Sequence, residues 1–131
     1  MFRILALFAL ALATPAYAKP LTVRMGETWL FAVRDGAPVD ARKTTSATVP
    51  APGQLKVSLQ PLFGATMTVT NASRFDYAYR ATLVLPTGAT GTAKSCVVPA
   101  NGKTAIEQWI KPVAAVRLDR FKRAPAGALC P

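Results

Sequence analysis

Apolar and polar residues alternate with a period of two along most of this chain, and this period constrains the fold more than any other feature. In the segment NASRFDYAYRATLVLP, residues 71–86, every second residue from Tyr77 to Leu85 is apolar. A period of two is typical of strands with one buried face, whereas helices repeat every 3.6 residues. The pattern places Tyr77 and Tyr79 on the same face as leucines that water disfavours. We therefore expect both tyrosines to belong to the core and not to a ligand-binding stripe.

The same alternation recurs in other segments, which turn residues separate. Further alternating or short apolar segments are residues 29–34, 55–60, 66–70, 96–98, 105–110 and 113–121. Eleven prolines disfavour long helices. We also interpret KTTSATV, residues 43–49, as an edge strand, because lysine and threonine protect an edge against mispairing. Seven or eight short strands at this spacing predict a single all-β domain, an antiparallel β-sandwich.

Two stretches resemble known families. The run MTVTNASRFDYAYRATLVLP, residues 67–86, resembles the second half of bacterial immunoglobulin-like domains, in which a Val-x-Asn turn precedes a strand with a Tyr-x-Ala pattern. The ending Trp109…Pro112…Val116-x-Leu118 is similar to that of small secreted proteobacterial proteins. The resemblance covers about residues 54–121 and implies an immunoglobulin-like sandwich, but it implies no activity. The cysteines are not placed like the inter-sheet pair of antibody domains.

The first 18 residues have the pattern of an export signal. A basic start at Arg3 precedes an apolar run over residues 4–13, and Ala16-Tyr17-Ala18 supplies the small residues that signal peptidase needs. The run is shorter than the roughly 20 residues of a membrane-spanning helix. We expect a signal peptide over 1–18 and one exported domain over 19–131, periplasmic or extracellular, without a transmembrane segment. A buried N-terminal helix is the alternative.

The chain has two cysteines, Cys96 and Cys130. Export places them in an oxidising compartment, where a matched pair usually forms a disulfide. Closing this loop of about 35 residues is worth roughly 3–4 kcal/mol in the chain-entropy model. A reactive thiol is the alternative, and it would need a positive, partly exposed site.

Several catalytic classes are excluded or disfavoured by the residues present. The chain has no histidine, so Ser-His-Asp and Cys-His catalytic sets are impossible. The stretch GATGTAKS, residues 88–95, has Ala93 where a phosphate-binding loop needs its second glycine, and we expect a hairpin loop there. Asp35 and Asp40 flank a turn, where aspartate often bonds its own backbone. We predict a protein that is not an enzyme and needs no cofactor or metal.

Asn71-Ala72-Ser73 matches the acceptor motif for N-glycosylation. The motif is short and occurs often by chance. We interpret it as a turn, since asparagine tolerates a left-handed backbone.

The basic excess is the feature with the clearest functional meaning. Without residues 1–18, 15 basic residues stand against six acidic ones, a net charge of +9. The candidates for anion binding are Arg74, Arg80, Arg117, Arg120, Lys122 and Arg123. A basic face fits an anionic envelope polymer or membrane surface, whereas nucleic acid is a rare partner of exported proteins. A solvated face that only confers solubility is the alternative.

These observations predict a non-enzymatic binding or structural module. We expect it to contact a protein partner or an anionic envelope polymer through a sheet edge or the basic face. The six acidic residues leave a small carboxylate-dependent hydrolase, or a hydrolase inhibitor, as the alternative function.

Overall fold

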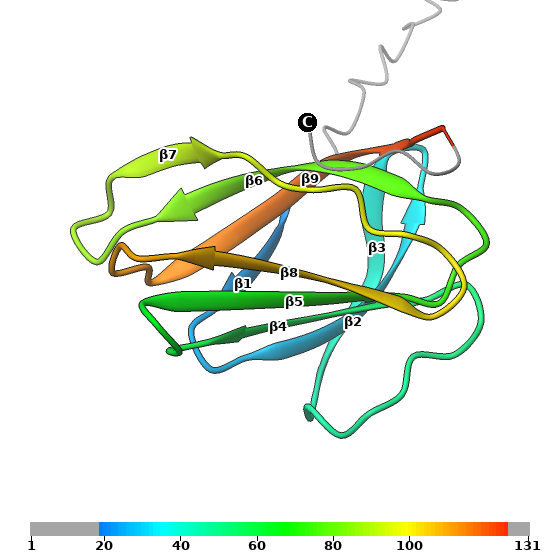
Figure 1. Cartoon of the computed structure of the whole chain (residues 1–131), viewed down its shortest axis with the longest axis horizontal. Coiled ribbons are helices and arrows are strands. Elements are labelled where there is room, and N and C mark those ends of the chain that lie inside the picture. Colours follow the sequence, from blue (N-terminus) through cyan, green and yellow to red (C-terminus); the bar gives the residue numbers. More distant parts are fainter. Residues whose placement is uncertain (1–18, 126–131) are drawn as a thin grey trace, which may run out of the picture.

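Two antiparallel sheets pack face to face (Figure 1). The computed structural model describes residues 19–125, and this part of the chain contains nine strands and no helix. The strands are β1 (Leu21–Arg24), β2 (Thr28–Arg34), β3 (Ala37–Thr44), β4 (Leu55–Gln60), β5 (Ala65–Asn71), β6 (Tyr77–Val84), β7 (Thr90–Ala93), β8 (Lys103–Trp109) and β9 (Ala115–Arg123). Sheet A has the order β1-β9-β6-β7, and sheet B has the order β3-β2-β4-β5-β8. Within residues 19–125, no helix is long and apolar enough to cross a membrane.

The predicted all-β sandwich is confirmed, with nine strands instead of seven or eight. The edge strand predicted over residues 43–49 is wrong, because β3, one of the two edge strands of sheet B, ends at Thr44 and shares only Lys43 and Thr44 with that range. Asp35 and Gly36 both have positive φ, 51° and 77°, as a tight hairpin between β2 and β3 requires. The partner strand therefore begins directly after Gly36.

The strand order differs from that of immunoglobulin domains. In those domains the first strand pairs with the second. Here β1 pairs with β9, and β2 belongs to the other sheet. The likeness to immunoglobulin domains lies in the two packed antiparallel sheets, an architecture that many unrelated topologies share.

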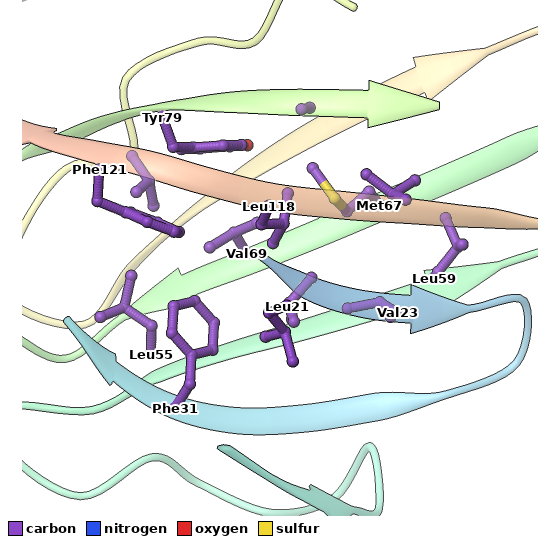
Figure 2. Close-up of a cluster of buried hydrophobic side chains, with 14 of the residues drawn as sticks. Leu21, Val23, Phe31, Leu55, Leu59, Met67, Val69, Tyr79, Leu118 and Phe121 are labelled. Atoms are coloured by element: carbon purple, nitrogen blue, oxygen red, sulfur yellow. The ribbon is translucent and has the colours of Figure 1, made fainter. Parts of the chain in front are cut away.

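Apolar side chains from both sheets fill the space between them (Figure 2). Phe31 and Leu55 project from sheet B, and Tyr79 and Phe121 project from sheet A. Tyr79 stacks on Phe121 with 5.4 Å between ring centroids. Tyr77 and Tyr79 are both buried, so their predicted place in the core is confirmed.

The buried side chain of Asn71 connects two segments in which the chain passes from one sheet to the other. These segments are the β5–β6 and β7–β8 connections. The Nδ2 of Asn71 donates to the carbonyl of Phe75, between β5 and β6, at 2.8 Å, and to that of Val98, between β7 and β8, at 3.2 Å. Its Oδ1 accepts bonds from the amide and Oγ of Ser73 at 3.0 and 2.6 Å. A carboxamide has two donor hydrogens and two acceptor lone pairs, and all are used inside the protein.

This network explains the apparent glycosylation motif. Asn71 is 0% exposed, and its amide nitrogen is engaged in two hydrogen bonds. The backbone of Asn71 is not left-handed, since it ends a regular strand and is absent from the positive-φ residues. The position requires the carboxamide of asparagine. The interpretation that asparagine stands here for a left-handed turn is therefore wrong.

Replacing Asn71 with alanine is expected to destabilise the domain by about 3 kcal/mol, because the buried amide and hydroxyl of Ser73 lose their acceptor and the carbonyls of Phe75 and Val98 each lose a donor. Chemical denaturation measures this change in the free energy of unfolding. The control is Thr70→Val in the same strand as Asn71, which removes an exposed hydroxyl bond to Thr104 of the neighbouring strand β8. We expect it to cost less than about 1 kcal/mol. Equal losses in the two variants would contradict the role of Asn71.

Candidate functional site

The outer face of sheet A carries a diagonal row of basic side chains. Arg117 of β9 lies opposite Thr22 of β1 and Thr82 of β6, and Arg24 lies opposite Ala115. Every second residue of a strand shares a face, so Arg24 and Arg117 are diagonal neighbours across β1 and β9. Such neighbours lie roughly 7–8 Å apart, and both arginines are exposed.

The row continues through an ion pair between Arg80 and Asp119. These residues face each other in the register of β6 and β9. Arg80 Nε donates to Asp119 Oδ1 at 2.8 Å, and Nη2 donates to Oδ2 at 2.6 Å. These hydrogen bonds raise the pKa of Arg80 above its ordinary value. Asp119 is the only acidic residue in the four strands of sheet A, and Arg80 holds it.

A β-bulge in β9 interrupts the row before its last member, Lys122. The register of β6 and β9 shifts between Ala78 and Arg80, and Arg120 takes a left-handed φ of 51°. The extra residue returns Phe121 to the core and leaves Lys122 exposed opposite Ala78. A cavity of about 600 Å³ beside the bulge is lined by Asp35, Gly36, Ala37, Arg80, Asp119, Arg120, Phe121 and Lys122. We call Arg24, Arg117, Lys122 and the Arg80–Asp119 pair the basic face.

The structure separates the six predicted anion-binding residues. Those on the basic face are Arg80, Arg117 and Lys122, with Arg120 at its margin. Arg123 instead stacks on the Phe75 ring, with its guanidinium carbon 3.6 Å from the centroid. Arg74 and Arg123 line another cavity, of about 560 Å³, beside Ser73 and Asn101. The six residues therefore lie in two separate places, the outer face of sheet A and one end of the sandwich.

Arg24 belongs to the basic face but is not among the residues predicted from the sequence. The alternation Leu21-Thr22-Val23-Arg24 places Arg24 on the outward side of its strand. No local pattern indicates that this first strand lies beside the last one. Only the pairing of β1 with β9 brings Arg24 next to Arg117.

Most acidic side chains have partners within the domain. Glu27 forms an ion pair with Lys43 at 3.0 Å, and the bond that it accepts from the Arg24 amide is the main cause of its lowered pKa. The other acids with structural partners are Asp40 with Arg34, Asp76 with the amide of Ala100, Glu107 with the amide of Cys96, and Asp119 with Arg80. Among residues 19–125, histidine, cysteine and acidic residues nowhere form a group of three that could hold a metal ion.

One buried polar atom has no hydrogen-bond partner in the described part of the chain, the hydroxyl of Tyr79. Burial raises the pKa of this phenol, and the charge of Glu107 raises it further. The group stays neutral at physiological pH. It packs between the sheets against Phe121 and is not part of the basic face.

Two predictions fall on residues outside the described ones. The predicted signal peptide covers residues 1–18, and the predicted partner of Cys96, Cys130, lies beyond residue 125. No protein-family model, curated protein or solved structure matches the chain. The functional interpretation depends on the geometry of the basic face itself.

Proposed function

We propose that this protein is an exported, non-enzymatic module that binds an anionic polymer of the cell envelope through the basic face. One observation carries this proposal. Arg24, Arg117 and Lys122 are exposed and have no ion pair within residues 19–125, while Arg80 neutralises the one acid of the sheet. Like charges at this spacing repel one another, and a polyanion along the row would replace repulsion with attraction.

The shape of the basic face favours a polymer over a compact ligand. Its charges follow a diagonal across three neighbouring strands, β1, β9 and β6, so they match charges repeated along a chain. Hydroxyls of Thr22 and Thr82 flank Arg117 in the register and can bond to sugar or sulfate oxygens. The aromatic residues of β6 and β9 are buried, so the face offers no stacking platform for bases. This supports a polysaccharide-type polyanion over nucleic acid.

The engagement of the acidic residues supports a non-enzymatic role. A carboxylate-dependent hydrolase needs two carboxyl groups roughly 5–9 Å apart around one substrate site. Here Glu27, Asp40 and Glu107 bond to separate parts of sheet B and its connections. Asp119 is committed to Arg80 by two charge-assisted bonds, which are among the stronger hydrogen bonds in proteins.

The proposal includes export and a disulfide. Removal of residues 1–18 and pairing of Cys96 with Cys130 both fit an oxidising compartment. The resemblance of the ending Trp109…Pro112…Val116-x-Leu118 to small secreted proteobacterial proteins agrees with this location. The disulfide would join the last residues to the segment between β7 and β8, the same segment that Asn71 holds through Val98.

Binding to dextran sulfate beads across a salt series tests the basic face. The variant Arg24→Glu/Arg117→Glu is expected to bind at least about ten-fold more weakly at low salt, because attraction becomes repulsion. The matched control is Arg42→Glu/Lys103→Glu, which changes net charge equally at exposed sites on the edge strands of sheet B. We expect a clearly smaller loss in the control. Equal losses, or no retention of the unaltered protein at low salt, would refute the proposal.

The mass of the protein collected outside the cytoplasm tests export and pairing together. We expect the mass of residues 19–131, lower by two hydrogens without reductant than with it. A chain that keeps residues 1–18 would contradict export, and a mass that reduction leaves unchanged would contradict the disulfide.

A further inference from the structure

Three large apolar side chains project from one end of the sandwich. They are Leu62, 55% exposed, Phe63, 84% exposed, and Ile110, 94% exposed. This is the end at which the β4–β5, β6–β7 and β8–β9 connections lie, to the left in Figure 1. We call these three residues the apolar tip. Exposed apolar side chains gathered at one end of a domain mark an interaction site more often than single exposed side chains do.

Gly64 brings the two halves of the apolar tip together. It follows Phe63 in the β4–β5 turn and has a φ of 94°. A Cβ at Gly64 would clash with the carbonyl oxygen of Trp109 and would lie 2.9 Å from the Cα of Ile110. The turn therefore packs against the backbone at the end of β8, and this contact brings the turn that carries Leu62 and Phe63 close to Ile110.

Phe63 is held in a backbone conformation that bulky residues avoid. Its φ is 50°, and the other non-glycine residues with positive φ in the described part are Asp35, Asp40, Asn101 and Arg120. Aspartate and asparagine adopt this region readily, whereas an aromatic residue there is strained. The Thr66 hydroxyl stabilises the turn by donating to the Leu62 carbonyl at 2.8 Å. Backbone strain of this kind clusters at sites that contact ligands.

Cations without an ion pair in the described part flank the apolar tip. Lys111 follows Ile110 and is exposed. Arg24 lies at the same end, because the next residue, Met25, donates its amide to the Ala114 carbonyl in the β8–β9 connection at 3.0 Å. The acid of this region, Glu27, is neutralised by Lys43. The end of the molecule thus combines an apolar projection with positive charge.

We propose that the apolar tip inserts into an anionic lipid surface while Arg24 and Lys111 contact the headgroups. Insertion of apolar side chains and attraction to anionic lipids together give the affinity of interfacial proteins, and either one alone is weak. The inference rests on the proposed function in one respect, since Arg24 belongs to the basic face as well. The apolar tip adds a second contact. A soluble polyanion cannot make this contact, because it has no apolar layer into which the tip could insert. The occupant is lipid because the projecting groups are apolar and the two cations at this end without an ion pair in the described part, Arg24 and Lys111, are exposed.

Co-sedimentation of the exported form with vesicles tests this inference. The vesicles contain phosphatidylglycerol and phosphatidylethanolamine, and vesicles of phosphatidylcholine alone are the neutral comparison. Phe63→Asn/Ile110→Thr is expected to lower binding to the anionic vesicles at least about ten-fold. Asparagine at residue 63 suits the left-handed backbone, so this variant is expected to fold. The matched control is Val49→Thr/Ile106→Thr, which removes exposed apolar residues outside the tip and should bind like the unaltered protein.

The outcomes separate the two proposals. If the tip variant still binds dextran sulfate beads but no longer binds anionic vesicles, the result supports both the basic face and the lipid inference. Vesicle binding that the tip variant keeps, or that neutral vesicles match, overturns the lipid inference and leaves the basic face intact. Sedimentation velocity gives a further outcome. If the unaltered protein and the control variant are dimers while the tip variant is a monomer, a second copy of the chain covers the tip, and the lipid inference is overturned.

Discussion

The carboxamide of Asn71 is the interaction on which the arrangement of the two sheets depends. It bonds to the β5–β6 crossing through Phe75 and to the β7–β8 crossing through Val98. A satisfied buried polar group of this kind specifies one arrangement, because any shift leaves a donor or acceptor without a partner. The held segments also place Val98 against Tyr77, where β6 begins. The register of β6 against β9 then determines which of their side chains lie on the outer face of sheet A.

The two ends of the sandwich have different characters. The Asn71 end is held by buried hydrogen bonds, whereas the opposite end exposes the apolar tip. The two positive-φ residues of the described part that are neither glycine, aspartate nor asparagine are Phe63 and Arg120. Phe63 lies in the apolar tip, and Arg120 lies at the margin of the basic face. Unfavourable backbone conformations thus occur where the surface is proposed to make contacts, as is common at functional sites.

The sequence was sufficient for features that depend on local pattern. The period of two identified most strands and the buried tyrosines, since alternation alone decides which side chains face the core. The predicted edge strand is wrong, because the tight turn at Asp35 and Gly36 lets β3 begin at Ala37. Arg24 was missed because its neighbour in space, Arg117, is far along the chain. Arg123 lies apart from the basic face, because the bulge at Arg120 changes which face later residues occupy.

The central claim is that basic side chains without counter-charges make the outer face of sheet A the anion-binding surface. Amide chemical shifts, followed by NMR while a short sulfated oligosaccharide is added, test it most directly. We expect the largest changes at Thr22, Thr82 and Arg117, which lie side by side across three strands. Changes concentrated around Arg74 and Arg123, with these three amides unaffected, would contradict the claim.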